Sequence, residues 1–110
     1  MRILLATLGL ILAAVPGTAA EGAKEGAKRG EALVQQSCSA CHATGRTGDS
    51  PTAAAPRLRE IGRKYPIENL QEALAEGVSV GHRGVEMPEY TFEPDQIDDI
   101  IAYLESIQTP

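Results

Sequence analysis

The chain has 110 residues and a formal net charge of −5, and its aromatic residues are one Phe, three Tyr and no Trp. This length suffices for one small domain, and so few aromatic side chains give it a thin core that normally needs a further stabilising group. The acidic balance, without a basic stripe or aromatic stacking residues, excludes a nucleic-acid-binding protein. An acidic surface indicates a partner with a basic surface patch, or serves only to keep the protein soluble.

The first 20 residues have the pattern of a secretory signal peptide. Arg2 supplies the positive charge, residues 3–15 are nearly all apolar, and residues 16–20 suit cleavage. The apolar run is too short for a settled membrane span. We expect cleavage near Ala20 and a mature domain of residues 21–110, whose formal net charge changes from −5 to −6 because only Arg2 is lost. An uncleaved anchor is the alternative.

Residues 21–28 contain the unit Glu-Gly-Ala-Lys twice. Because glycines weaken a helix, we expect a frayed, solvated lead-in here. A helix is expected to become firm near Arg29 and to continue through Gln36. Gly30 lies inside this helix, where a glycine costs about 1 kcal/mol relative to alanine. Close approach of a second helix would explain it.

The next five residues, Cys-Ser-Ala-Cys-His at 38–42, form the motif C-x-x-C-H. Its two thiols, three positions apart on a helical turn, can add to the two vinyl groups of a haem, and the following histidine becomes the proximal iron ligand. We therefore predict one haem c attached through Cys38 and Cys41, with His42 on the iron. The large, apolar haem would also complete the thin core.

Two other interpretations of the motif fit less well. A redox disulfide of the C-x-x-C type accompanies a βαβ pattern, which this sequence does not show. A zinc site needs four ligands. Only Cys38, Cys41, His42 and His82 could supply them, and the neighbours Cys41 and His42 would then both have to bind one ion.

After the motif, the sequence predicts a loop and two short helices. Residues 43–52 are rich in turn formers and have no apolar period. A short helix is expected over residues 59–64, and a third helix has Pro66 in its first turn and Gly77 as a left-handed cap just past its end. Residues 78–90, with further glycines and a Met-Pro pair, are expected to contain no regular element.

The last helix has the clearest pattern. Pro94 suits its first position, acidic residues in the first turn favour the positive end of the helix dipole, and Glu93 is a weak N-cap. Its apolar residues recur at helical spacing and form a single stripe: Ile97, Ile100, Ile101, Leu104 and Ile107. Because no strand pattern occurs, the predicted fold class is all-α, with about four helices around the haem.

The haem iron needs a sixth ligand or an open site. Met87 is the only methionine besides the initiator, and Pro88 stiffens the loop that presents it. A thioether is a soft, neutral ligand that favours Fe(II), so a His/Met pair raises the reduction potential. Gap-filling in the core is the alternative role for Met87. His82 is a rival ligand, although a loop histidine near the haem rim or in solvent is the simpler interpretation.

Residues 28–107 resemble a class I bacterial cytochrome c. Gly30 matches the small residue of the family's N-terminal helix, and Tyr103 matches the aromatic residue of its C-terminal helix. The resemblance implies that these two helices cross at those positions.

The resemblance also assigns residues around the haem. Pro56 matches the proline whose carbonyl accepts a hydrogen bond from Nδ1 of the proximal histidine, and Leu58 would pack on the porphyrin. Met87-Pro88 with Tyr90 matches the family's distal Met-Pro-x-aromatic segment. Four arginines are candidates for neutralising a haem propionate: Arg57, Arg59, Arg63 and Arg83.

The expected function is therefore that of a small periplasmic electron carrier, not an enzyme. Such a protein passes one electron between redox proteins, for example a periplasmic dehydrogenase, a membrane cytochrome complex or a terminal oxidase or reductase. We expect a monomer or transient complexes, with no nucleic acid and no stable membrane span in the mature form. A haem subunit of a larger oxidoreductase is one alternative, and a gas-binding or gas-sensing haem protein, with an open distal site, is the other.

Overall fold

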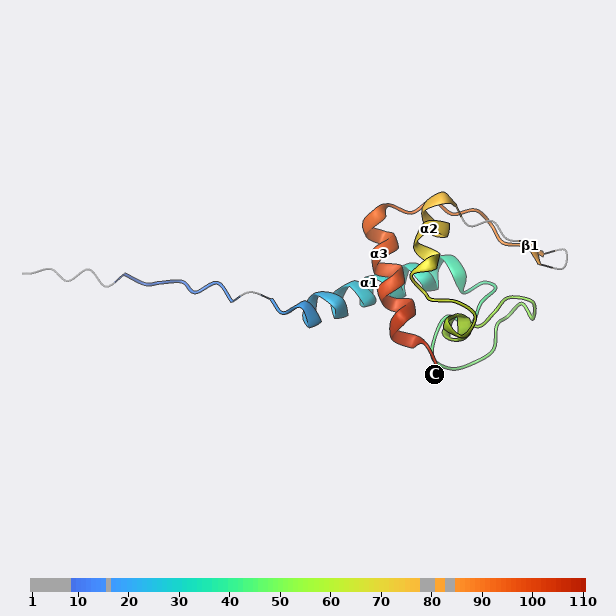
Figure 1. Cartoon of the computed structure of the whole chain (residues 1–110), viewed down its shortest axis with the longest axis horizontal. Coiled ribbons are helices and arrows are strands. Elements are labelled where there is room, and N and C mark those ends of the chain that lie inside the picture. The colour runs from blue at the N-terminus through green and yellow to red at the C-terminus, as the bar shows by residue number, and fades with distance from the viewer. Residues whose placement is uncertain (1–8, 16, 78–80, 83–84) are drawn as a thin grey trace, which may run out of the picture.

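The computed structural model describes residues 9–15, 17–77, 81–82 and 85–110. Its elements are three α-helices, one 3-10 helix and two short strands, in the order α1 (Ala19–Cys38), η1 (Leu58–Arg63), α2 (Asn69–Glu76), β1 (Gly81–His82), β2 (Val85–Glu86) and α3 (Pro94–Ile107). α1 and α3 cross at the centre of the molecule, while α2 and η1 pack against α3 (Figure 1). The predicted all-α fold class is confirmed.

The strands form a minimal antiparallel pair, with Gly81 opposite Glu86 and His82 opposite Val85. The prediction that residues 78–90 contain no regular element is therefore wrong. A strand of two residues is too short to show the alternation of apolar and polar residues by which strands are recognised.

α1 begins at Ala19, so the prediction of a frayed lead-in over residues 21–28 is also wrong. Thr18 is the N-cap, and its side-chain oxygen accepts a hydrogen bond from the amide of Glu21 at 3.4 Å. Gly26 is buried in this segment, and a Cβ added there would lie 3.1 Å from Oδ1 of Asp99. At least one glycine of the repeated unit is therefore a packing residue rather than a helix breaker.

The close approach of helices at Gly30 is confirmed. A Cβ added to Gly30 would lie 1.9 Å from the backbone oxygen of Asp99 in α3, far inside van der Waals contact. Arg29, the preceding residue, donates from Nε and Nη2 to the two carboxylate oxygens of Asp99, at 2.7 and 2.9 Å. Tyr103, the predicted partner of the crossing, is buried one turn further along α3.

The core lies between α1, α3 and the segment from η1 to α2. Val34 of α1 is only 1% exposed, so its side chain is fully enclosed in this core. The apolar stripe predicted for α3 is confirmed, because all of its residues are buried. The full cluster is Val34, Leu58, Ile61, Ile67, Ile97, Ile100, Ile101, Tyr103, Leu104 and Ile107.

The ends of the short elements differ slightly from the predicted ones. α2 starts at Asn69 because residues 66–68 form turns, in which Pro66 and Ile67 accept bonds from Asn69 and Leu70. Gly77 has a positive φ of 90°, as expected after a helix, but its ψ of 99° lies outside the left-handed helical region. The weak N-cap of α3 is reinforced, since the amide of Glu93 donates to Oε1 of Gln96 at 2.9 Å.

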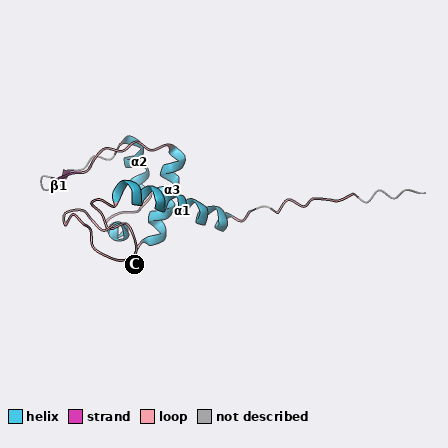
Figure 2. Cartoon of the chain, turned by 180° about the vertical axis from the view of Figure 1, so that it is seen from behind, coloured by secondary structure: helices cyan, strands magenta, loops and turns pink. Residues whose placement is uncertain are grey.

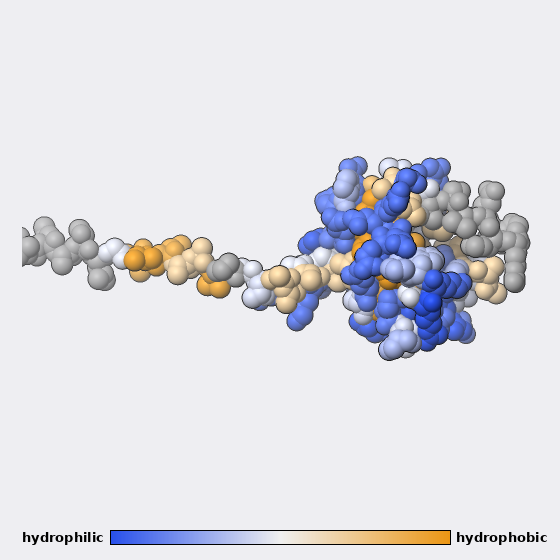
Figure 3. Space-filling model, viewed as in Figure 1, coloured by the Kyte–Doolittle hydropathy of each residue, from blue (hydrophilic) through white to orange (hydrophobic). Residues whose placement is uncertain are grey.

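The described part of the N-terminal segment projects away from the helical body, which Figure 2 shows from behind. Its large apolar side chains are almost fully exposed, from 87% to 91%: Leu10, Ile11, Leu12 and Val15. Figure 3 shows them as an apolar stretch beside a mostly hydrophilic face of the body. Among the described residues, no helix has the length and apolar character needed to cross a membrane. Residues 1–8 and 16, part of the predicted signal peptide, lie outside the described residues.

Candidate haem-binding site

The haem motif is a compact turn at the end of α1. Cys38 is the last residue of the helix, and its carbonyl accepts hydrogen bonds from the amides of Cys41 at 3.2 Å and of His42 at 2.9 Å. Two thiols and an imidazole thus come from one turn of chain. Both cysteines are free and half-buried, which leaves them available for thioether bonds.

The surroundings of Cys38 suit a neutral sulfur. Its side chain packs against the hydrophobic core, and burial raises the pKa of the thiol to about 11. A thioether carries no charge at any pH, so bonding to a haem would remove the ionisable group from this apolar setting.

His42 is oriented by a backbone carbonyl. Its Nδ1 lies 2.6 Å from the carbonyl oxygen of Pro56, the contact that the resemblance to a family implied. Since a carbonyl only accepts, Nδ1 carries the hydrogen, and in the neutral imidazole Nε2 is then the nitrogen with the lone pair. Within the described residues no hydrogen bond occupies Nε2, so this nitrogen is the one available to a metal.

The loop after the motif is tied back to it. Thr52 donates from its amide to the carbonyl of Cys41 at 3.1 Å, and Ala43 donates from its amide to Oγ of Ser50 at 3.0 Å. Leu58 donates to the carbonyl of Ala43 at 3.0 Å and is itself buried in the core. The contact of Leu58 with the porphyrin stays a prediction.

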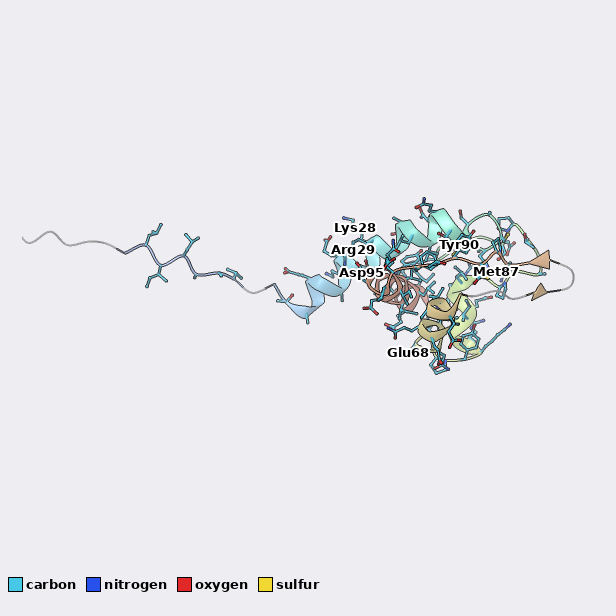
Figure 4. The ribbon with its side chains drawn as sticks, turned by 90° about the horizontal axis from the view of Figure 1, so that it is seen from above. Lys28, Arg29, Glu68, Met87, Tyr90 and Asp95 are labelled. Carbon is cyan, nitrogen blue, oxygen red and sulfur yellow. The ribbon has the colours of Figure 1, made fainter. Side chains whose placement is uncertain are left out.

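Met87 lies on the segment between β2 and α3, together with Tyr90 (Figure 4). It is half-buried. Tyr90 and Phe92 stack with ring centroids 6.0 Å apart, and Phe92 packs against the core, which anchors this segment to the helical body. The hairpin formed by β1 and β2 and the loop after the haem motif extend from the same end of the helical body, opposite the N-terminal segment (Figures 1 and 2). The side chain of His82 lies outside the described residues.

Two of the candidate arginines already have carboxylate partners. Arg57 pairs with Asp49 and, at 3.6 Å, with Glu60, and Arg63 also lies 3.6 Å from Glu60. Arg59 donates from Nη2 to the carbonyl of Gly48 at 2.7 Å, whereas its Nη1 is buried with no partner in the described part of the chain. Arg83 lies outside the described residues.

The residues fit a haem in chemistry and in polarity. The turn offers two thiols and a free imidazole nitrogen, Met87 offers a soft thioether, and the buried Nη1 of Arg59 is an unused donor that would suit an acidic oxygen. Apolar side chains that pack against the core also remain only half-buried, as expected where a large apolar group completes it: Leu33, Leu70 and Leu74.

Sequence patterns did not reveal the hydrogen bonds by which two residues hold the framework of the site, although Tyr103 was expected at the helix crossing. The hydroxyl of Tyr103 donates to the carbonyl of Thr44 at 2.5 Å, which attaches the loop after the motif to α3. Gln108, just past the end of α3, hydrogen-bonds to both α3 and η1. The bonds to Thr44, Leu58 and Gly62 follow from no local motif, because they join residues that are 59, 50 and 46 positions apart in the sequence.

The fold and the site together define a small all-α protein built to hold one covalent haem. The sequence model of the Cytochrome c family matches residues 27–108, and the chain belongs to this family; its small size fits class I. Its cofactor is haem c, attached through Cys38 and Cys41, and its role is haem-based electron transfer. Comparison with curated proteins and with solved structures gives no significant match.

Proposed function

We propose that this protein is an exported one-electron carrier whose haem iron is ligated by His42 and Met87. The observation that carries the proposal is the contact between Nδ1 of His42 and the carbonyl of Pro56. This bond fixes the tautomer and directs the free Nε2 lone pair to an iron, as in metal sites whose histidines are oriented by an acceptor on the other ring nitrogen.

The haem supplies an iron that gains and loses one electron without any bond in a substrate being made or broken. The chain's part is to keep the ligand set unchanged between the two redox states. The hydrogen bond to Pro56 makes the imidazole a better donor, while Met87, as a neutral soft ligand, favours Fe(II) and raises the potential. The core contacts of Phe92 and the stacking of Tyr90 on it restrain the segment that carries Met87.

The surface supports a free carrier over a tightly bound subunit. In residues 17–77 and 87–110, Tyr65 is the only large apolar side chain that is exposed, and it is 39% exposed. A permanent subunit interface resembles a domain core cut in half and needs a contiguous apolar area. A partner that docks and leaves requires no such area.

Charge supports a partner with a basic docking surface. Three glutamates, spaced four residues apart along α2 and its N-cap, are all exposed: Glu68, Glu72 and Glu76. Glu89, two residues after Met87, continues this acidic surface, because its carboxylate lies beside Gly77 at the end of α2. A positively charged partner patch would be attracted to this face, and the attraction would weaken with salt.

Export is proposed from the N-terminal segment. Its apolar side chains make no core in the described structure, which is the behaviour of a leader rather than of part of the domain. Cleavage near Ala20 would remove Thr18, the N-cap of α1, so the mature helix would begin near Glu21 with its first residues exposed. The mature protein would act in the periplasm. Dehydrogenases, membrane cytochrome complexes and terminal oxidases or reductases of that compartment are its proposed redox partners.

The spectrum of Met87→Ala tests the proposal. If the Met87 sulfur is on the iron, the oxidised protein has a weak sulfur-to-iron charge-transfer band in the far red. The variant should lose this band, have a lower reduction potential and bind carbon monoxide, while the thioethers and His42 retain the haem. A ligand-binding or sensing protein would instead bind carbon monoxide as wild type.

His82→Ala is the matched control, because it removes a potential ligand close in sequence to Met87. The far-red band should remain in this variant. The opposite pattern, with His82→Ala altering the spectrum and Met87→Ala leaving it unchanged, would mean bis-histidine ligation, a lower potential and more reducing partners.

A further inference from the structure

Gln108 connects the end of α3 to η1 through its side-chain amide. Its Nε2 donates to the carbonyl of Leu58 at 2.9 Å and to the carbonyl of Leu104 at 2.8 Å, and its Oε1 accepts from the amide of Gly62 at 2.8 Å. Three bonds on one half-buried side chain leave it little freedom. The space for it depends on Gly62, since a Cβ there would lie 2.9 Å from Oε1.

The position of this amide accounts for the form of η1. Leu58 and Gly62 are four residues apart, so in an α-helix the amide of Gly62 would donate directly to the carbonyl of Leu58. Here the side-chain amide of Gln108 stands between the two groups, accepting from one and donating to the other. The segment is a 3-10 helix with a glutamine inserted in place of one α-helical hydrogen bond.

The acceptor for His42 lies two residues before η1. Pro56 and Leu58 are separated only by Arg57, which is extended, with φ −66° and ψ 123°. The amide of Leu58 donates to the carbonyl of Ala43, next to His42, while the carbonyl of Leu58 accepts from Gln108. Leu58 is thus held on one side by Ala43, the residue after the haem motif, and on the other by Gln108, the residue after α3. The carbonyl of Pro56 lies 2.6 Å from Nδ1 of His42 at the start of this restrained segment.

We propose that Gln108 is a positioning residue for the proximal side of the haem, which holds the Pro56 carbonyl against Nδ1 of His42 and thereby tunes the iron's reduction potential. The inference deepens the proposed function and rests on His42 being an iron ligand. A hydrogen bond to a well-placed carbonyl increases the electron density that the imidazole gives to the iron and so stabilises Fe(III). Loosening the carbonyl should therefore raise the potential.

The test is Gln108→Met in the haem-loaded protein, because methionine keeps the side-chain length and neutrality but makes none of the three hydrogen bonds. Two readouts report on His42 itself: solvent exchange of its Nδ1 proton, followed by NMR, and the reduction potential. We expect exchange to become about tenfold faster or more, because the ring proton is exposed by local opening, and the potential to shift upward. Thr109→Val is the control, since it removes only the side-chain bond of Thr109 to the carbonyl of Arg59, 3.2 Å long.

A second variant covers the case in which Gln108→Met does not mature. Gln108→Glu keeps an acceptor for the amide of Gly62 but loses both donors, so it should also speed the exchange of the Nδ1 proton. For Gln108→Glu only the exchange rate of the Nδ1 proton is compared with wild type, because the added negative charge changes the reduction potential by itself. Lower stability with unchanged exchange and potential would overturn the positioning role. If the NMR spectrum of the haem-loaded wild type shows no His42 Nδ1 proton shifted by the haem, His42 is not an iron ligand. That result would contradict the proposed function itself.

Discussion

At the scale of single residues, hydrogen bonds from distant parts of the chain hold the haem turn in place. Tyr103 is the clearest case, because it is 6% exposed and its hydroxyl reaches the carbonyl of Thr44, two residues beyond His42. The ring belongs to the core, while its polar tip restrains the loop after the motif.

Removal of this hydroxyl should therefore cost stability without changing the core. Tyr103→Phe should lower the free energy of unfolding by about 1 kcal/mol, the usual loss for one hydrogen bond, with some addition from the unpaired carbonyl. Denaturant unfolding followed at the haem absorbance measures the difference. Equal midpoints for the two proteins would show that the bond contributes nothing.

The pH dependence of this difference has a definite sign. Burial raises the pKa of Tyr103 above its ordinary value of 10.0. The folded state therefore favours the neutral phenol of Tyr103. Its contribution to stability is fully present below the pKa of tyrosine in the unfolded chain, and it is lost as pH rises through the pKa of Tyr103 in the folded protein. Wild type should thus lose stability more steeply than Tyr103→Phe above about pH 10.

Residues that carry chemistry were predictable from the sequence, whereas residues that hold them were not. Cys38, Cys41 and His42 stand in a local motif whose spacing is set by one helical turn. The hydrogen bonds of their supports, Tyr103 and Gln108, depend on which carbonyls the fold brings to them. The resemblance to a family gave Tyr103 only as the aromatic residue of the helix crossing. Pro56 was placed correctly only because of the resemblance to a family.

At the scale of elements, the crossing of α1 and α3 organises the fold, and Gly30 determines how closely the two helices approach. The backbone oxygen of Asp99 occupies the space that any side chain at position 30 would need. This obstacle is backbone on both helices, so it cannot be relieved by a change of rotamer. The helices would have to move apart, and Val34, which is 1% exposed, would become less well buried.

Gly30→Ala should therefore destabilise the haem-loaded protein by about 3 kcal/mol, the upper range for overpacking in a core. Gly22→Ala is the matched control in the same helix, because no atom lies within 4 Å of a Cβ added there. It should leave stability unchanged or raise it by up to about 1 kcal/mol through helix propensity. Denaturant unfolding of both variants makes the comparison, and equal stabilities would contradict the role of Gly30.

The sequence predicted a helix well where apolar residues recur along its whole length, but it did not predict where a helix begins. The stripe of α3 spans the whole helix, so its existence and buried face followed from spacing alone. The start of α1 depends on the cap at Thr18 and on packing of Gly26 against α3, and glycine content alone predicted the opposite. Contact with another element outweighed local propensity there.

At the scale of the whole molecule, the exposed glutamates of α2 and its N-cap yield a prediction about small redox reagents. With the acidic face of α2 near the segment that carries Met87, the reduced protein should react faster with tris(phenanthroline)cobalt(III), a cation, than expected for a neutral surface. It should react more slowly with ferricyanide, an anion. Added salt should reduce the cation rate and increase the anion rate.

Two double variants locate the effect. Glu72→Gln with Glu76→Gln removes two charges from the acidic face, and stopped-flow traces should show both salt dependences weakened. Glu21→Gln with Glu25→Gln removes the same charge from the start of α1, at the opposite end from the hairpin, and should change the rates less (Figure 1). Equal changes in the two double variants would show that only net charge matters and that α2 is no docking face.

The remaining property of the whole molecule is its dependence on the haem for folding. The core cluster of the described residues contains a single aromatic side chain, Tyr103, and several leucines at its edge stay half-buried. The apolar area buried by the polypeptide alone is therefore small against a conformational entropy cost of about 1–2 kcal/mol per residue. The haem adds the missing apolar area, and its two thioether bonds and axial ligands restrain the chain around it.

We accordingly expect the mature chain without haem to be largely unfolded. The double variant Cys38→Ala, Cys41→Ala, produced without haem, should show little helix by circular dichroism and no cooperative thermal transition, whereas the haem-loaded wild type should show both. Alanine at these two positions lowers no helix propensity, so loss of structure would be due to the missing haem rather than to the substitutions. A cooperative melt of the haem-free variant would mean that α1, α3 and η1 form a self-sufficient core, and the structural role assigned to the haem would then be wrong.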